Sequence, residues 1–465
     1  MEALAIRFAQ ENFGDAELGD QRLTKRLVRA ALRMLEHPEG TLPAKMQTPA
    51  DLKGLYRLVD HDQVTHAAVL QTHRELTLSR MAESEEVVLL IHDTTQLNYT
   101  SRKSLEGLGQ LAAGGGKGYL AHNTLAVKED GSVIGLANQI LYLRPKVPKK
   151  EPREKRRQRR NRETRLWKAG SEAVGPPPPT CKWVDVCDRG GDLFEYLDHK
   201  HVQDGDYVVR SKHNRVVWAG NDPDRVVKLH DYARSLDTLE THEIKVSVNN
   251  GCQARMARVR VAAGRVTLPV PKPKCGEHGD EPLEASVVQV KEIDPPKGVK
   301  ALEWVLLTNE PCRSAQDALR VAGWYAKRPI VEEYHKAMKT GCGIELPQLT
   351  DKSRLEPVIA MISVVAVFLL GLRDAARDER KAPEPAENFV PTTYVKVINA
   401  CRWKDAKRPT TLYEFLLAVA RMGGHQNRKS DGPPGWLTLW RGWQQLIVMV
   451  TAVEAVKAVE RCGVS

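Results

Sequence analysis

The stretch from Tyr325 to Lys339, YAKRPIVEEYHKAMK, sets one carboxylate among basic and phenolic side chains. Counted from Glu332, Arg328 and Tyr325 lie four and seven residues earlier. Lys336 and Lys339 lie four and seven residues later. Because offsets of four and seven return to nearly the same face of an α-helix, the five side chains are expected on one stripe. Such a stripe suits a site that binds a metal ion beside a polyanion, although a solvated charged face has the same pattern.

Length and composition restrict the class of protein around this stretch. A chain of 465 residues is too long for one ordinary core, so two or three domains are expected. An apolar content of 42% with 28% charged residues is typical of a globular protein, and the net charge of +11 favours a polyanionic partner. The eight cysteines include no CxxC pair, and Cys275 with His278 is too isolated for a zinc site. Reduced thiols in a cytoplasmic protein are therefore expected.

No membrane segment is expected. The N-terminus lacks the basic start and apolar core of a signal peptide. The longest apolar run, Val358 to Leu372, covers 15 residues and is interrupted by Ser363. This run is too short for a membrane span and predicts a buried helix.

Residues 1 to about 72 are predicted to be helical. Asp20 is a candidate N-cap, and Thr48 with Pro49 predicts the start of a second helix, which carries Arg57. Another helix is expected to begin near Thr65. After Asp20 a basic stripe recurs at helical spacing, and it requires either phosphates or acidic neighbours to offset its own repulsion; its members are Arg22, Lys25, Arg26, Arg29 and Arg33.

Two aspartates follow predicted buried strands. The run from Val87 to Ile91 predicts a strand that ends at Asp93 and its neighbours, and Trp183 to Cys187 predicts a strand that delivers Asp188. Strand-end carboxylates are well placed to bind a ligand, although such residues more often cap a turn. With Glu332 as a third carboxylate and no His or Cys cluster, the expected ions are Mg²⁺ or Mn²⁺. Two such ions about 4 Å apart can activate a hydroxyl and stabilise the leaving oxygen of a phosphodiester.

The remaining pattern places β structure between and after these strands. A hairpin is predicted from Leu125–Val127 and Val133–Leu143, with a turn at Asp130-Gly131. Further strands are expected at Tyr207–Arg210 and Trp304–Leu307. The alternating segment from about 215 to 302 predicts a β-rich insertion. The basic segment from Lys146 to Lys168 predicts a solvated helix or a mobile arm.

After Leu372 the chain is predicted to be helical. Near its end an apolar stripe recurs every three or four residues, which indicates either core or a self-association surface; it contains Trp436, Trp440, Trp443, Ile447 and Val450.

Taken together, these motifs resemble the DDE transposases of the bacterial insertion-sequence-four group, most closely those of the Tn-five type. The order strand-Asp, strand-Asp, helix-Glu and the spacing of Tyr325, Arg328, Glu332 and Lys339 carry the resemblance. Other matching segments extend it from near residue 13 to about 445. They are GDQRLTKRLVRAA, LYRLV, HDTTQLNY, VCDRGGDLFEYL, VVRSKH, IDPPKG, EWVLLTNEP, EEYHKAMKTGCG, ARMGG and GWLTLWRGW.

The resemblance implies a role for each matching residue. Asp93, Asp188 and Glu332 correspond to the catalytic triad, which binds two Mg²⁺ ions or, alternatively, Mn²⁺. Trp304 corresponds to an aromatic residue that stacks on a flipped base. The positions that correspond to DNA contacts are Tyr325, Arg328, Lys336, Lys339, Arg210, Lys212 and His213, together with Arg26 and Arg57 in the end-recognition domain.

The implied fold is α/β, with an RNase H-like catalytic core that carries the β-rich insertion, flanked by helical domains. The expected domains are a DNA-end-recognition domain (1–72), a catalytic domain (73–372) and a C-terminal dimerisation domain (373–465). The implied function is cut-and-paste transposition, with cleavage of inverted-repeat ends through hairpins and joining of the 3′ ends to target DNA. The protein is then expected to be a nucleoid-associated homodimer in the cytoplasm of a bacterium. Two alternatives are a structure-selective nuclease on the same core and a non-catalytic inhibitor of transposition derived from a transposase.

Two departures from the family pattern affect the local structure. Pro329 lacks the N–H that would bond to the Tyr325 carbonyl, and it disfavours helical geometry at Arg328. A helix that starts at Pro329, after a kinked turn, is therefore predicted. The glycines of DRGGD after Asp188 predict a looser turn there.

Overall fold

The computed structural model describes residues 2–461 apart from 112–114, 146–151, 153–154, 156–158, 160–161, 247–254, 273–276, 376, 379 and 429–430. These residues form two compact units. The sheet unit comprises Leu78–Asn98 and Gly109–Val331, and the helical unit comprises Met1–Thr77, Tyr99–Leu108 and Glu332–Ser465. This division groups residues by compactness, and the three domains expected from the sequence remain a proposal.

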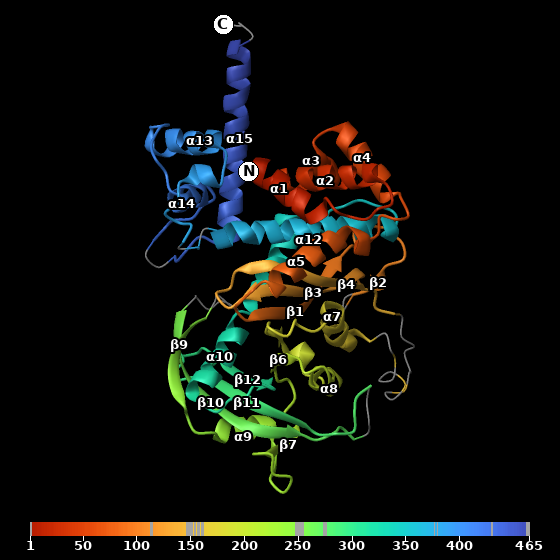
Figure 1. The fold of residues 1–465 in the computed structure, drawn as a ribbon, viewed down its shortest axis with the longest axis vertical. Helices are drawn as coiled ribbons and strands as arrows, with labels where there is room; N and C mark the ends of the chain where they lie inside the picture. Colours follow the sequence, from red (N-terminus) through yellow and green to blue (C-terminus); the bar gives the residue numbers. More distant parts are fainter. Residues whose placement is uncertain are drawn as a thin grey trace. The chain divides into compact units, whose positions relative to one another are not determined.

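The sheet unit is mixed α/β and is built on one sheet, which has twelve strands among the described residues (Figure 1). Its order is β2-β3-β1-β5-β6-β12-β11-β10-β7-β8, with β4 paired to β3 and β9 paired to β10. Strands β1, β5 and β6 are parallel, and the other pairs are antiparallel. The strands are β1 (Val88–Asn98), β2 (Gly109–Gln110), β3 (Lys117–Lys128), β4 (Val133–Tyr142), β5 (Trp183–Cys187), β6 (Asp206–Arg210), β7 (Val216–Ala219), β8 (Val226–Lys228), β9 (Glu240–Val246), β10 (Arg255–Leu268), β11 (Leu283–Glu292) and β12 (Glu303–Thr308).

The predicted hairpin and the strands at Tyr207 and Trp304 are confirmed as β3–β4, β6 and β12. The first strand differs from its prediction, because β1 does not end at Asp93 but runs on to Asn98. The antiparallel partner β3 supplies hydrogen-bonding neighbours along this extension, where Asp93 pairs with Asn123 and Asn98 with Gly118. A strand continues as long as a neighbour satisfies its backbone groups.

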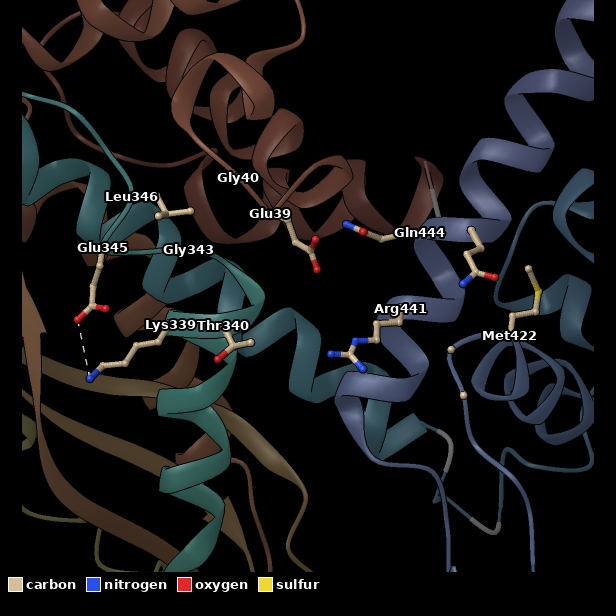
Figure 2. Close-up of a pocket in the computed structure, with 13 residues that line it drawn as sticks. Glu39, Gly40, Lys339, Thr340, Gly343, Glu345, Leu346, Met422, Arg441 and Gln444 are labelled. Carbon is tan, nitrogen blue, oxygen red and sulfur yellow. Dashed lines mark ion pairs between the residues drawn. The ribbon is translucent and has the colours of Figure 1, made fainter.

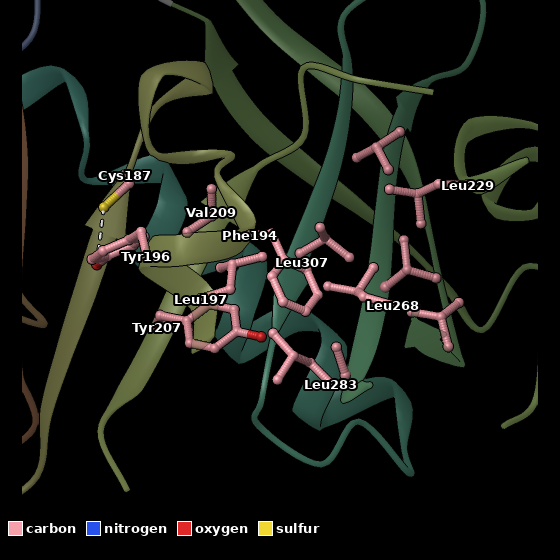
Figure 3. Close-up of a cluster of buried hydrophobic side chains, with 14 of the residues drawn as sticks. Cys187, Phe194, Tyr196, Leu197, Tyr207, Val209, Leu229, Leu268, Leu283 and Leu307 are labelled. Carbon is pink, nitrogen blue, oxygen red and sulfur yellow. Dashed lines mark hydrogen bonds between the residues drawn. The ribbon is translucent and has the colours of Figure 1, made fainter. Parts of the chain in front are cut away.

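Helices α7 (Leu166–Val174), α8 (Phe194–Val202), α9 (Leu229–Ser235) and α10 (Ala315–Ala326) belong to the sheet unit, with short 3₁₀ turns η1 (Glu163–Arg165) and η2 (Arg189–Gly191). A buried cluster joins α8 to one face of the sheet, where Phe194 and Leu197 contact Tyr207 and Leu307 (Figure 3). Ser314 forms a capping box with Asp317 at the start of α10.

Part of the basic segment predicted from Lys146 to Lys168 lies outside the described residues, as does Cys275. The end of this segment forms η1 and the first residues of α7.

The helical unit contains α1 (Glu2–Phe13), α2 (Gln21–Glu36), α3 (Leu42–Met46), α4 (Pro49–Val59), most of α5 (His66–Ala82), the π-helical η3 (Ala337–Gly341), α12 (Lys352–Ala375), the turn η4 (Ala386–Asn388), α13 (Thr392–Trp403), α14 (Leu412–Met422) and α15 (Trp436–Arg461). The predicted caps Asp20 and Thr48 accept backbone N–H bonds at the starts of α2 and α4. Thr65 likewise accepts the N–H of Ala68, at 3.2 Å, beside the start of α5.

Helix α12 is buried, as its apolar run predicts. Among the described residues it alone is long and apolar enough to cross a membrane, and 89% of its most apolar window is buried inside the structure. The apolar stripe of α15 is also core, since Trp436, Trp440, Trp443 and Val450 are all buried. Trp443 stacks on Tyr394 of α13 with ring centroids 5.8 Å apart. Of the two interpretations of this stripe, core or self-association surface, burial in the core is confirmed.

Lys45 is a fully buried cation of the helical unit, and it donates to the carbonyl of Cys342 at 2.8 Å and to that of Pro38. Burial lowers the pKa of Lys45 from 10.5 to about 8. Because the folded pKa lies below the unfolded one, the unfolded chain binds more protons between pH 8 and 10.5. Stability is therefore expected to rise with pH across this window, by up to about 3 kcal/mol.

Denaturant unfolding of the wild type and of Lys45→Met at several pH values between 7 and 10.5 measures this effect. The difference in unfolding free energy between the two proteins should change with pH in that window. A difference that stays constant would show that Lys45 ionises at its ordinary pKa.

Candidate active site on the sheet unit

The candidate site begins where the central parallel strands diverge. His92 of β1 is paired with Cys187 of β5, and this is the last pair of their parallel register. Asp93 and Asp188 each follow that pair by one residue. Because side chains alternate along a strand, the two aspartates leave the same face of the sheet at adjacent positions.

Contacts with a backbone N–H and with a guanidinium help to hold the Asp93 carboxylate. Its Oδ1 accepts the backbone N–H of Thr94 at 2.9 Å, and its Oδ2 accepts from an Arg328 Nη at 3.0 Å. The side chain is 14% exposed. Its strand neighbour Asn123 is fully buried and accepts from Gln139 Nε2 at 2.7 Å. These two amides were not singled out from the sequence, although polar residues inside otherwise apolar strands are a usable signal.

Asp188 combines the two roles that the sequence left open. Its Oδ1 caps η2 by accepting the N–H of Gly190 at 2.8 Å, so the turn-capping role is realised. Its Oδ2 lies 4.0 Å from the same Arg328 nitrogen, so the carboxylate also faces the cation that Asp93 binds. At 31% exposure it is the more open of the two aspartates.

The turn after Asp188 is not loosened by its glycines, contrary to the prediction. A Cβ on Gly190 would lie 2.1 Å from the Trp167 ring, and one on Gly191 would lie 2.6 Å from Cys187 Cβ. The glycines are therefore required by close packing. Asp192, four residues after Asp188 and overlooked in the sequence, accepts the backbone N–H groups of Lys212 at 2.6 Å and His213 at 3.0 Å.

Arg328 lies in a break between helices, as Pro329 predicts. Helix α10 ends at Ala326 and α11 (Pro329–Lys336) begins at the proline. Two contacts with the β3–β4 turn position this break. Trp324 Nε1 donates to Glu129 at 2.6 Å, and Gly131 lies so close to Ile330 that a Cβ would be 3.3 Å from its Cδ1. Neither contact is visible in the sequence.

The five side chains counted from Glu332 therefore do not lie on one continuous helix, in agreement with the break predicted at Pro329. Tyr325 is on α10, Arg328 is in the turn, Lys336 ends α11 and Lys339 is in η3. Proline removes one backbone bond and changes the helix direction, so spacing alone no longer determines the face.

Trp304, Tyr325 and Arg210 are brought together beside the aspartates. The Trp304 and Tyr325 rings meet edge to face with centroids 5.0 Å apart. Burial raises the pKa of Tyr325, and the nearby Arg210 guanidinium partly offsets this rise. Arg210 also donates to the Glu303 carbonyl at 2.9 Å. The side chains of Lys212 and His213 are exposed at the loop after β6.

The other predicted residues belong to the helical unit. Glu332 and Lys336 are exposed on α11, whose Val331–Glu332 bond is the boundary between the units. The third carboxylate of the triad consequently remains a prediction. Lys339 forms a 3.9 Å ion pair with Glu345 and lines a cavity of about 820 Å³, into which Arg441 and Gln444 of α15 also project (Figure 2).

Some arginines of the basic stripe on α2 form ion pairs with acidic neighbours. Arg29 and Arg33 both pair with the buried Asp51, and Arg22 pairs with Asp20 at 2.9 Å. The hydrogen bond from Arg29 lowers the pKa of Asp51. Arg26 and, on α4, Arg57 are exposed, and neither has a side-chain hydrogen bond or ion pair within the described part of the chain.

The donor chemistry of the sheet-unit pair fits a hard divalent cation. Asp93 and Asp188 offer only oxygen atoms, and both direct Oδ2 at one positive charge. Among the residues that the structure describes, no group of three or more His, Cys, Asp and Glu is arranged to hold a metal ion. Two carboxylates supply fewer ligands than a divalent cation takes, so this pair by itself does not complete a metal site.

Comparison with known families identifies one segment of the chain. Residues 6–64 match the family model described as transposase DNA-binding, and they cover α1 to α4 of the helical unit with Arg26 and Arg57. The chain carries a transposase DNA-binding domain at its N-terminal end, which supports its assignment as a DNA-binding transposase.

Proposed function

We propose that this chain is a DDE transposase of the insertion-sequence-four group that cuts DNA at transposon ends and joins those ends to a target. One combination carries the proposal: a transposase DNA-binding segment in the same chain as two strand-borne carboxylates that meet at Arg328. The strand order β4-β3-β1-β5-β6, with three parallel strands after an antiparallel hairpin, supports an RNase H-like core.

Asp93, Asp188 and Glu332 would hold Mg²⁺ or Mn²⁺, two ions in the complete site. Such ions supply Lewis-acid activation of the attacking hydroxyl and stabilise charge on the leaving oxygen. Asp93 is already oriented for this task, because the Thr94 N–H holds one of its oxygens and leaves the other directed into the site.

The cationic and aromatic residues would bind the DNA strand. Arg328 offers a planar guanidinium suited to a phosphate, and Arg210, Lys212 and His213 line the neighbouring strand end. The half-buried Trp304, which packs edge to face on the buried Tyr325, would stack on an unpaired base. Lys336 and Lys339 would contribute further phosphate contacts. Positioning of the phosphodiester by these groups would supply much of the catalysis.

The proposed reaction is a series of in-line displacements at phosphorus. Water nicks one strand at each end, and the freed 3′-hydroxyl attacks the opposite strand to leave a hairpin. A second water opens that hairpin, and the 3′-hydroxyl finally attacks target DNA. Each step breaks one P–O bond as it forms another, so one site can serve all four.

Two protomers would hold the two ends together. From its middle onward α15 exposes Val448, Val456 and Val459, which is consistent with a partner helix there. Because the partner is chromosomal DNA, the protein would act in the cytoplasm at the nucleoid of a bacterium.

A strand-transfer assay tests the function directly. The substrate is a precleaved duplex taken from the inverted repeats that flank the gene, mixed with supercoiled plasmid and Mg²⁺. Joined product is expected from the wild type, and at least a hundredfold less from Glu332→Gln. A structure-selective nuclease would cut without joining, and an inhibitor derived from a transposase would bind without cutting. Either result would overturn the proposal.

A further inference from the structure

A network of buried polar side chains occupies the opposite face of the sheet from Asp93 and Asp188. Asp185, His92 and His122 are fully buried, and Lys200 is 7% exposed. On β1, His92 and Thr94 alternate with Asp93, and on β5, Asp185 and Cys187 alternate with Asp188. The network therefore belongs to the same strands as the aspartates, but none of its members takes part in the proposed reaction.

Asp185 is the charged centre of this network. Its Oδ2 accepts from Tyr196 at 2.7 Å and lies 3.2 Å from Lys200 Nζ and 3.4 Å from His92 Nε2. Burial alone would raise the pKa of Asp185, but the Lys200 ammonium and then His92 offset burial, and the pKa is lowered. Burial and this carboxylate raise the pKa of Tyr196, so its hydroxyl remains a donor. The Cys187 thiol in turn donates to Tyr196 at 3.4 Å (Figure 3).

Two histidines extend the network across β1 to β3. His92 Nδ1 lies 3.4 Å from His122 Nε2 and 3.2 Å from Thr124 Oγ1. His122 Nδ1 lies 2.9 Å from Thr94 Oγ1, and Thr94 is the residue whose N–H holds Asp93. The contacts thus run without interruption from α8 to the neighbour of a proposed catalytic residue.

Helix α7 packs against the buried polar network. A Cβ on Gly170 would lie 2.9 Å from His122 Nε2 and 3.1 Å from His92 Nδ1, so only glycine allows the helix this close. Lys200 Nζ also lies 3.4 Å from Ser171 Oγ on the same helix. The polar groups are therefore confined between helices and sheet, where unpaired charge is costly.

The apolar residues of these strands cannot determine the register. Val88, Leu89, Leu90 and Ile91 are all buried, so β1 has apolar side chains on both faces. In such strands a shift by one residue exchanges one apolar side chain for another of similar size. On β5, Val184 and Val186 lie on one face and Trp183 and Cys187 on the other, so both faces again carry buried apolar side chains. Hydrophobic burial alone would therefore stabilise more than one register to a similar extent.

A shift by one residue would abolish the candidate site. It would move Asp93 to the opposite face of β1 relative to Asp188, because alternation reverses every side chain. The same shift would turn His92 away from Asp185. The carboxylate would keep Lys200 and Tyr196 of α8, but its contact with β1 would be lost. The polar network thus distinguishes between registers that the apolar side chains leave nearly equal.

We propose that this network is a register lock, in which Asp185 and Lys200 are positioning residues that hold Asp93 and Asp188 on one face. This inference rests on the proposed function only for the role of the two aspartates. The register of β1 on β5 does not depend on that role and is tested separately.

The test compares removal of one charge with removal of both. Lys200→Met leaves Asp185 buried without its cation and is expected to impair folding. Lys200→Arg keeps a cation beside Asp185 and is expected to fold. Asp185→Leu with Lys200→Met replaces the pair by apolar side chains and is expected to fold. Arg255→Met with Glu292→Leu is the matched control, because it removes an ion pair between β10 and β11 of the same sheet.

A cysteine probe reports the register directly. Ile91→Cys places a thiol opposite Val186, on the other face from Cys187, so no disulfide can form in the native register. In the Asp185→Leu/Lys200→Met background, a shifted β1 would set position 91 opposite Cys187. Mild oxidation followed by peptide mass spectrometry is expected to find this disulfide in that background, and in neither the control background nor Ile91→Cys alone. Its absence from the double variant would overturn the lock.

Mn²⁺ titration of the same proteins separates the two proposals. The double variant is expected to bind Mn²⁺ at least tenfold more weakly than the wild type and the control. If wild-type Mn²⁺ binding did not depend on Asp93, the proposed function would fail, while the disulfide result would still decide the lock.

Discussion

Asp93→Asn is expected to reduce DNA cleavage by about a thousandfold, which corresponds to roughly 4 kcal/mol of lost transition-state stabilisation. Asparagine can still accept the Thr94 N–H, so the position of the side chain is kept while its charge is lost. Asp188→Asn should have a comparable effect, since its Oδ2 faces the same cation. The measurement is the rate of cleavage of end-bearing DNA in Mg²⁺, together with the melting temperature.

The control for this experiment is Asp224→Asn, an exposed aspartate of the same unit in a turn far along the chain from β1. It should cleave at the wild-type rate. Folded Asp93→Asn protein with wild-type cleavage would show that this carboxylate is not a ligand, and the proposed site would be wrong.

Arg328→Gln is expected to raise the affinity of the DNA-free protein for Mn²⁺ by about tenfold or more. In the structure this guanidinium lies 3.0 Å from Asp93 and 4.0 Å from Asp188, so it neutralises the charge that a divalent ion requires. Removing a unit charge at about 4 Å changes the interaction by roughly 1–4 kcal/mol for dielectric constants between water and a protein surface. Cleavage of DNA by the same variant should nevertheless fall, because a phosphate contact is lost.

Mn²⁺ affinity is measured by electron paramagnetic resonance of the free ion, so it does not depend on activity. Arg320→Gln is the matched control: this arginine is on α10, with its guanidinium over the Trp324 ring, 5.6 Å from its centroid. Its replacement should leave the affinity unchanged. An unchanged Mn²⁺ affinity in Arg328→Gln would mean that Arg328 does not pair with Asp93 and Asp188 in solution.

Much of the local structure follows from the sequence because its causes are local. The caps at Asp20, Thr48 and Ser314 were predictable from side chains that satisfy nearby backbone N–H groups. The break before Pro329 follows from the missing N–H and the fixed φ of proline. The buried helix α12 follows from the apolar run Val358 to Leu372, whose side chains are stabilised by removal from water.

The predictions that failed depended on neighbours distant in sequence. The length of β1 was underestimated because β3, thirty residues later, supplies its partners. The turn after Asp188 is tight because Trp167 of another helix packs on Gly190.

Residue types and their local spacing can be read from the sequence alone: two aspartates at the ends of apolar runs, an arginine before a proline, and a basic N-terminal segment. The tertiary structure was needed to show that Asp93 and Asp188 share a face and that both lie near Arg328. The physical reason is that strand register and helix direction depend on long-range pairing. In β1 and β5, where both faces carry apolar side chains, the proposed register lock would set this pairing.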